Sequence, residues 1–343
     1  MERIPITILG GSDRKRSRLP DRASGMHPLA AYKGAALRID GQPLALILAR
    51  RLLASGGFGP VSIAGPARIF QPLVEDLWGP DEPGPAPSVI DTDSTVAMNL
   101  KAAIGHHEAH HEGPLGILAC DVLPTTPELT DLRARFEAAR PVAIWLPFIK
   151  SPPDPAELGA FAWKPKYRIV PAEPELEGHE ALPVLPGHLG ILKPSRLRLR
   201  LLFRLMDAAY RTRNRPVASR SWAMLWRVSG SLLWADLQRL MTLKPPTRTI
   251  SVVVAGLRLS AALRSRQLEA AELERMVADV FLHHEYRRLP RPIVLPMLTT
   301  LTLAEDIDTA EEAASVCTEL LDDPELGPLD DEPGEPGPEG ERA

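Results

Sequence analysis

The chain has 343 residues, enough for one large domain with an insertion or for two domains. Its 40 basic and 44 acidic residues give a net charge of −4, which argues against a general nucleic-acid binder because such proteins carry a basic excess. Two cysteines are too few for a disulfide scaffold and favour a reducing, cytoplasmic location. The sequence begins with a strand pattern and not with that of a signal peptide. No apolar run reaches the roughly 18 residues that cross a bilayer, so no membrane span is expected.

The first strand pattern, at residues 4–9, ends in a glycine pair and a basic cluster. Gly10 and Gly11 allow the backbone to approach an anion closely and to adopt positive φ. The amides that follow, and a basic run that includes Arg14 and Arg16, supply positive charge. The pattern predicts a phosphate-binding junction between a strand and a long polar loop.

Strand and helix patterns then alternate along the chain. A short strand and turn are expected at 36–41, helices at 43–55 and 96–107, and apolar strands at 60–64, 88–90, 115–119 and 142–146. This order favours an α/β fold with a doubly wound, mostly parallel, Rossmann-like sheet whose ligand site lies beyond the carboxyl ends of the strands. Gly10, Asp91 and Asp121 all fall at such ends, so we expect them to share one edge of the sheet.

The pattern changes after residue 193 to long, Arg-rich helical stretches. Their tryptophans, Trp222, Trp226 and Trp234, are expected in the core of a helical insertion. A last strand is expected at 293–301 and a closing helix at 309–321. The predicted domains are therefore a core at 1–193 and 290–321, a helical insertion or subdomain at 194–289, and a disordered acidic tail at 322–343.

Carboxylates at two places have the pattern of metal ligands. Asp121 leaves the end of an apolar strand, where an acid needs a partner, and Mg²⁺ shared with substrate phosphates would be one. A helix cap or a turn is the alternative role. Asp306 and Asp308 flank Ile307, so in an extended segment both acids point to one side while Ile307 faces the core. We expect Asp308, or alternatively Asp306, to be the second metal ligand, and Thr309 to cap the helix that follows.

Lys33 precedes the short strand and turn at 36–41. A flexible ammonium there could neutralise the charge of a triphosphate or of leaving pyrophosphate. The alternative is an exposed loop lysine.

The histidines between residues 106 and 111 have the i,i+4 spacing of a zinc site. Gly105 on one side and Gly113 on the other place them in a connection, which favours a solvated helix end. Cys120 lies inside an apolar run, so it is expected to be a small core residue and not a nucleophile.

Five blocks follow one another in the chain: Ile8-Leu9-Gly10-Gly11, Lys33, Ile39-Asp40-Gly41-Gln42-Pro43-Leu44, Leu118-Ala119-Cys120-Asp121 and Asp306-Ile307-Asp308-Thr309-Ala310-Glu311-Glu312. In this order they resemble the nucleotidyltransferases that include molybdenum cofactor guanylyltransferase and the sugar-phosphate nucleotidylyltransferases. The resemblance covers residues 1–150 and 290–321.

The resemblance implies a glycosyltransferase-A-like sheet that binds a nucleoside triphosphate and Mg²⁺. An acceptor phosphate would attack the α-phosphorus, and pyrophosphate would leave. The residues implied are Leu9, Gly10, Gly11, Ser12, Thr95 and Asn99 at the nucleotide, Arg14, Arg16 and Lys33 at the phosphates, Asp121 with Asp308 or Asp306 at the metal, and Lys166, Arg168 and His188 at the acceptor. For Lys166 and Arg168, surface solubility is the alternative role.

The leading hypothesis is a cytoplasmic, Mg²⁺-dependent nucleotidyltransferase that acts on a small phosphorylated acceptor and not on nucleic acid. The irregular phosphate loop and the large insertion leave open a nucleotide-sensing or scaffold protein, and the oligomeric state is also open. A glycosyltransferase that uses a nucleotide-sugar is a third hypothesis because it can share the sheet and the carboxylates. The glycine pair and its basic run favour triphosphate handling instead.

Overall fold

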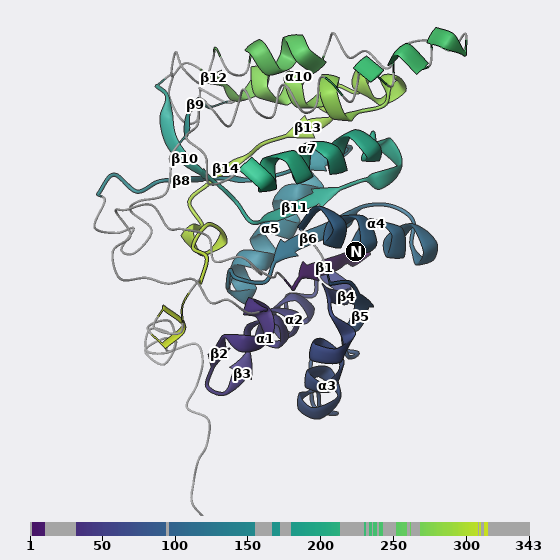
Figure 1. Ribbon diagram of the computed structural model, residues 1–343. Helices are drawn as coiled ribbons and strands as arrows, with labels where there is room; N and C mark the ends of the chain where they lie inside the picture. The colour runs from purple at the N-terminus through teal and green to yellow at the C-terminus, as the bar shows by residue number, and fades with distance from the viewer. Residues whose placement is uncertain are drawn as a thin grey trace, which may run out of the picture.

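The computed structural model (Figure 1) describes residues 2–10, 32–93, 96–154, 167–171, 180–212, 230, 233, 234, 236–238, 240–242, 252–258, 261, 268–307, 309 and 312–314. Its helices include α1 (Lys33–Ala36), α2 (Leu44–Ala54), α3 (Ala67–Leu77), α4 (Val96–His110), α5 (Thr126–Ala139), α7 (Leu199–Thr212) and α10 (Ala270–Phe281). Short 3-10 turns are η2 (Pro194–Arg196), η3 (His284–Arg288) and η4 (Leu301–Leu303). No helix in this described part is long and apolar enough to cross a bilayer.

A seven-stranded sheet lies at the centre, in the order β13-β7-β11-β6-β1-β4-β5. Its strands are β1 (Ile4–Leu9), β4 (Phe58–Gly65), β5 (Ser88–Asp91), β6 (Leu115–Ala119), β7 (Ile144–Trp145), β11 (Leu189–Leu192) and β13 (Ile293–Val294). β1 is parallel to β4 and β6, and β4 is parallel to β5, so the carboxyl ends of these strands meet at one edge. β11 is antiparallel to both β6 and β7. The sheet is mostly parallel, and the predicted α/β fold class is confirmed.

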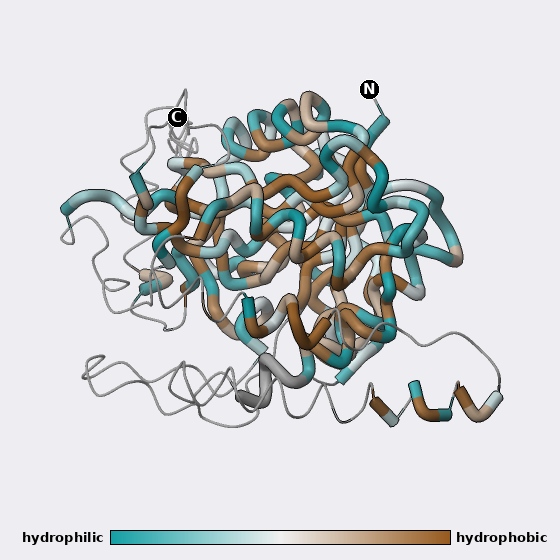
Figure 2. The backbone as a smooth tube through the Cα atoms, turned by 90° about the horizontal axis from the view of Figure 1, so that it is seen from above, coloured by the Kyte–Doolittle hydropathy of each residue, from teal (hydrophilic) through white to brown (hydrophobic). Residues whose placement is uncertain are grey.

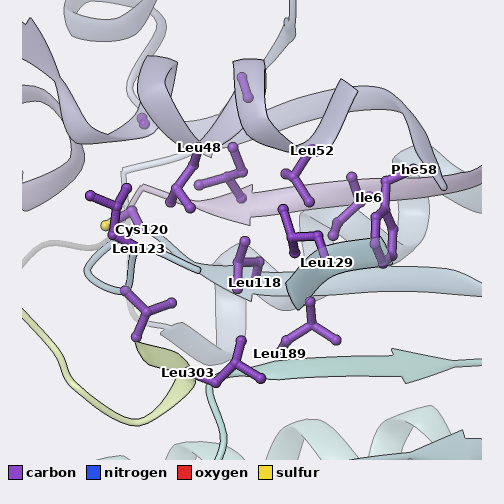
Figure 3. Packing of buried hydrophobic residues seen from close by; sticks show 14 of the residues in the cluster. Ile6, Leu48, Leu52, Phe58, Leu118, Cys120, Leu123, Leu129, Leu189 and Leu303 are labelled. Atoms are coloured by element: carbon purple, nitrogen blue, oxygen red, sulfur yellow. The ribbon is translucent and has the colours of Figure 1, made fainter. Parts of the chain in front are cut away.

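Alternation along the strands explains why helices cover both faces of this sheet. Ile6 of β1 and Leu118 of β6 join one apolar cluster with Leu52 of α2, as Figure 3 shows. Ile117, the neighbour of Leu118, belongs to a second cluster with Ile104 of α4 and residues of α7. Because successive side chains of a strand point to opposite faces, the two clusters form separate layers.

A smaller sheet, in the order β12-β9-β10-β8-β14, adjoins the central one (Figure 1). Its strands are β8 (Phe148–Lys150), β9 (Tyr167–Val170), β10 (Leu182–Pro186), β12 (Leu268–Glu269) and β14 (Met297–Leu298). The chain crosses between the sheets from β7 to β8 and again from β13 to β14, and a proline stands at each crossing, Pro147 and Pro296. Proline has no N–H to donate, so the backbone hydrogen bonds between neighbouring strands are interrupted at Pro147 and Pro296. The strand expected at 293–301 is therefore two short strands, which corrects that prediction.

A tight hairpin follows α1. β2 (Arg38–Ile39) pairs with β3 (Gln42–Pro43) through Asp40 and Gly41, whose φ angles are 50° and 75°. Two consecutive positive φ values are typical of a type I′ turn, for which a sequence Asp-Gly is well suited. The predicted strand and turn are confirmed, although Ala36 ends α1 and does not begin the strand.

The stretch 194–289 holds α7 and α10, as its helical pattern predicts, but also β12, which pairs with β9. Trp234 is 62% exposed, so its expected place in the core is wrong. The helical pieces that surround it lie at the margin of the molecule, outside the packed layers (Figure 2). Trp222, Trp226 and the tail 322–343 lie outside the described residues.

Candidate active site

Lys33 and Asp121 form an ion pair at the carboxyl edge of the central sheet. Nζ of Lys33 donates a hydrogen bond to Oδ2 of Asp121 over 3.0 Å, and the two side chains are 11% and 17% exposed. Lys33 is thus not the exposed loop lysine of the alternative prediction. Asp121 has a partner, as expected for an acid at the end of a buried strand.

The packing of α1 against the end of β6 brings the two charges together. A Cβ atom on Gly34 would lie 3.0 Å from Cβ of Cys120 and 3.2 Å from Cβ of Ala45. A side chain at this position would therefore require α1 to shift by a few tenths of an ångström from the end of β6 or from α2. Gly34 follows Lys33 and Cys120 precedes Asp121, so the close backbone approach determines the ion pair.

Cys120 itself has the role that the sequence predicts. It is a buried, free cysteine, and its burial raises the pKa of the thiol above the ordinary value. A thiol that holds its proton is a poor nucleophile. Cys120 is a packing residue.

His188 reaches Asp121 from the antiparallel strand β11. Leu189 begins this strand opposite Leu118, so the residue before it lies beside the end of β6. The carbonyl of His188 accepts the N–H of Ala119 at 3.1 Å, and its Nδ1 lies 3.8 Å from Oδ1 of Asp121. The resemblance implied a contact between His188 and the acceptor, which stays a prediction, but its observed neighbour is the candidate metal ligand.

The environment of Asp121 strongly favours its charged form. Burial by itself would raise the pKa of Asp121, but the imidazole of His188 and the ammonium of Lys33 outweigh burial and hold the pKa well below its ordinary value. A carboxylate that stays ionised is suited to bind a cation or to orient a cationic side chain.

The lowered pKa predicts how the stability depends on pH. A carboxylate whose pKa is lower in the folded state stabilises the fold above its unfolded pKa of about 4, and this contribution is lost as the pH falls through the folded pKa. We expect the free energy of unfolding of the wild type to exceed that of Asp121→Asn from pH 7 to about 5. This difference should shrink below about pH 4. Urea unfolding at a series of pH values measures it. A difference that vanishes above pH 5 would contradict the assignment.

The segment around Asp306 docks on the same strand end. The N–H of Ile307 donates to the carbonyl of Asp121 over 2.6 Å, and the N–H of His188 donates to the carbonyl of Leu303 over 2.8 Å. Ile307 is 3% exposed and faces the core, as predicted. These backbone bonds bring the half-buried Asp306 into the neighbourhood of Asp121.

Thr309 makes the predicted helix cap. Its side chain accepts the N–H of Glu312 at 3.1 Å, and the carboxylate of Glu312 accepts the N–H of Thr309 at 3.0 Å. Asp308 lies outside the described residues, so its role as a metal ligand stays a prediction. In the part of the chain that is described, no group of three or more His, Cys, Asp and Glu side chains is arranged to hold a metal.

Gly10 lies at the same edge, directly after β1. Its N–H donates to the carbonyl of Ala64 over 2.9 Å, and a Cβ atom here would lie 2.7 Å from the ring of Phe70. Packing against Phe70 is thus sufficient reason for a glycine. Leu9 is 9% exposed and packs toward α4. The other predicted residues Gly11, Ser12, Arg14, Arg16, Thr95 and Lys166 lie outside the described residues, and their roles stay predictions.

A polar network lies between β5 and the start of α4. Asn99 is 4% exposed, and its Oδ1 accepts a hydrogen bond from Oγ1 of Thr92 over 3.0 Å. Asp93 accepts hydrogen bonds from the hydroxyl of Tyr32 and, over 3.1 Å, from Arg68. Tyr32 precedes the lysine of the ion pair, so Asp93 helps to hold that segment against the sheet. Sequence reasoning did not single out Asp93 or Tyr32, although Asp93 stands two residues after a strand end.

Arg168 lies on β9 of the smaller sheet. Its side chain is exposed, and its guanidinium donates to the carbonyl of Ala181 over 3.0 Å. This contact agrees with the alternative surface role, and contact with an acceptor stays a prediction.

The histidines near the end of α4 stack on one another. The ring centroids of His106 and His110 are 4.4 Å apart, and burial followed by the charges of neighbouring imidazoles lowers the pKa of His106. His110 is exposed, as expected for a solvated helix end. His107 is only 3% exposed, which corrects the prediction for that residue, because it lies on the face of α4 that packs on the sheet.

No family model matches the chain, and no curated protein does. Among solved structures, it is similar to a hypothetical transferase from Thermus thermophilus, with 16% identity, coverage of 91% of this chain and 100% of that chain, and a TM-score of 0.52. It is also similar to CMP:2-keto-3-deoxy-manno-octonic acid synthetase complexed with CTP, with 13% identity, coverage of 93% and 98%, and a TM-score of 0.46. A third is 4-diphosphocytidyl-2C-methyl-D-erythritol synthase from Anaerococcus prevotii, with 7% identity, coverage of 93% and 99%, and a TM-score of 0.44. At these identities, the first similarity shows a shared fold.

Proposed function

We propose that the protein is a nucleotidyltransferase that transfers a nucleoside monophosphate from a nucleoside triphosphate to a small phosphorylated acceptor and releases pyrophosphate. The observation that carries this proposal is the largely buried ion pair of Lys33 and Asp121. It lies beyond the carboxyl ends of parallel strands, where doubly wound sheets bind their ligands. The shared fold with the transferase from Thermus thermophilus supports it.

We expect this edge to bind Mg²⁺ through Asp121 and a carboxylate of the segment 306–308. Asp121 stays ionised, and the segment of Asp306 and Asp308 is joined to the backbone of Asp121 by the N–H of Ile307. One or two carboxylates together with phosphate oxygens are the ligands that Mg²⁺ prefers. When bound, the ion would neutralise negative charge on the phosphates.

The chain's own residues would act by position and charge. An oxygen of the acceptor phosphate forms the new bond to the α-phosphorus, while the bond from that phosphorus to pyrophosphate breaks and pyrophosphate takes the electron pair. Lys33 would stabilise the charge that develops on the phosphate oxygens. This route requires no protein nucleophile, which agrees with the buried thiol of Cys120.

Pyrophosphate release tests the proposal. The full chain is incubated with Mg²⁺, each of the four nucleoside triphosphates, and a panel of sugar and polyol phosphates. We expect release with a preferred base and one acceptor class, and loss of release when EDTA removes the metal. Tight triphosphate binding without turnover would instead indicate a nucleotide sensor. A parallel incubation with nucleotide-sugars tests the third hypothesis, because release of a nucleoside diphosphate there would indicate a glycosyltransferase.

A further inference from the structure

An exposed apolar stripe lies on the insertion, at the margin of the molecule (Figure 1). The described residues between 230 and 241 are helical. Five of these described residues are apolar and have exposed fractions from 48% to 79%: Leu233, Trp234, Leu237, Leu240 and Met241. We call them the insertion stripe.

The spacing of the insertion stripe is that of one face of a helix. At about 100° per residue, its five side chains fall within an arc of about 120°. Asp236 lies outside this arc and is 8% exposed, so this polar residue is buried while the apolar side chains of the stripe are exposed. This is the reverse of an ordinary surface helix. Figures 1 and 2 both show these helical pieces at the margin of the molecule.

A second helical piece, residues 252–258, repeats the pattern. Val252 is 8% exposed and packs with Leu201 of α7, whereas Val254 and Leu257 are 39% and 51% exposed. Val254 and Leu257 are three residues apart, so they share a face of the helix. The insertion therefore exposes apolar side chains from two helical pieces while α7 anchors it to the core.

The charge of the insertion is as unusual as its apolar face. Residues 194–266 contain 15 Arg and Lys residues but only 2 Asp and Glu residues, in a chain that has 40 basic and 44 acidic residues overall. The same stretch holds Trp222, Trp226 and Trp234. Exposed aliphatic and Trp side chains in a stretch of sequence rich in Arg and Lys are typical of helices that lie in the interface of an anionic membrane.

We propose that the insertion docks this protein on the surface of an anionic lipid bilayer. The insertion stripe would enter the boundary between headgroups and acyl chains, and the Arg and Lys residues of the insertion would attract anionic headgroups. The protein would lie on the bilayer and not cross it. This inference is independent of the proposed transfer reaction, because its residues and its measurement differ from those of the candidate active site.

Two other candidate partners match the insertion stripe less well than a bilayer does. A second copy of the chain would bring the same excess of basic residues to a symmetric contact, where like charges repel. The acidic tail 322–343 has the opposite charge, but its large apolar side chains are two leucines and it has no aromatic residue, so it could not bury the insertion stripe. A bilayer supplies both the negative charge and the apolar volume.

Co-sedimentation of the full chain with vesicles tests the proposal. The vesicles contain phosphatidylcholine alone or mixed with phosphatidylglycerol. We expect binding to the mixed vesicles, little binding to phosphatidylcholine alone, and weaker binding as salt rises. The double variant Trp234→Glu/Met241→Glu should bind at least about tenfold more weakly, because two side chains that would be buried become charged.

Leu77→Glu is the matched control, since Leu77 is a 38% exposed apolar residue on α3. It should bind as the wild type does, and circular dichroism and the Tm should show that all variants are folded. No binding to mixed vesicles, or equal binding by the double variant, would overturn the proposal. So would a concentration-dependent dimer that the double variant abolishes, or vesicle binding that requires removal of residues 322–343.

Discussion

Asp121→Asn is expected to lower kcat/KM for nucleotidyl transfer by at least about 100-fold, because the change removes the negative charge that would bind the metal and orient Lys33. Oδ2 of Asp121 accepts a hydrogen bond from Nζ of Lys33 over 3.0 Å, and Oδ1 of Asp121 lies 3.8 Å from Nδ1 of His188. An amide of nearly the same shape keeps the volume but not the charge. Pyrophosphate release under saturating Mg²⁺ measures the effect.

Asp131→Asn is the control for this change. Asp131 lies on α5, is 54% exposed, and pairs with Arg135 over 2.7 Å. An exposed i,i+4 ion pair contributes little to stability, so we expect turnover within about twofold of the wild type. If Asp121→Asn is folded and turns over at the wild-type rate, the assignment of the active site is wrong. Loss of activity in both Asp121→Asn and Asp131→Asn would indicate a general effect of the lost charge and would also contradict the assignment of the active site.

Gly34→Ala is expected to destabilise the protein by about 1–3 kcal/mol, the usual cost of adding a methyl group to a tightly packed site. The new Cβ would lie 3.0 Å from Cβ of Cys120, an atom attached directly to the backbone of the strand end, so neither side can move away by a side-chain rotation alone. We also expect reduced turnover, because α1 would carry Lys33 away from Asp121. Urea unfolding and pyrophosphate release measure the two effects.

Gly105→Ala is the control for Gly34→Ala, because it adds the same methyl group to a helix without a close neighbour. Gly105 lies within α4, and a Cβ atom there would meet nothing within 4 Å. Alanine is the better helix former, so this variant should be more stable than the wild type by about 0.5–1 kcal/mol. Opposite signs for the two substitutions are the expected result. If both Gly34→Ala and Gly105→Ala stabilise the protein, α1 does not pack against β6 as closely as the structure shows.

Local patterns in the sequence correctly predicted several parts of the fold. The apolar run before Asp121 formed β6, and the run before Gly10 formed β1, because alternating and continuous apolar residues report directly on burial in a sheet. The capping box of Thr309 and Glu312 and the turn at Asp40 were also predictable. Each of these signals depends on residues that are close in sequence.

The arrangement of the site depended on contacts that are distant in sequence. Lys33 and Asp121 are 88 residues apart, and their pairing required the approach of Gly34 to Cys120. His188 came to Asp121 because β11 runs antiparallel beside β6, a register that no local pattern indicates. Pro296 divided the strand that the sequence predicted at 293–301 into β13 and β14. The prediction that Trp234 lies in the core was wrong, because a local helical pattern does not indicate which residues cover a helix.

The sequence by itself determined the α/β class, the parallel strands β1, β4, β5 and β6, and the acid at the end of β6, since hydrophobic periodicity and turn chemistry act over a few residues. The tertiary structure decided which of the predicted polar residues meet, because the pairing of strands and the packing of small side chains bring together segments from opposite ends of the chain. It placed Lys33, His188 and the segment of Asp306 around Asp121, and left Arg168 on the exposed surface of the smaller sheet.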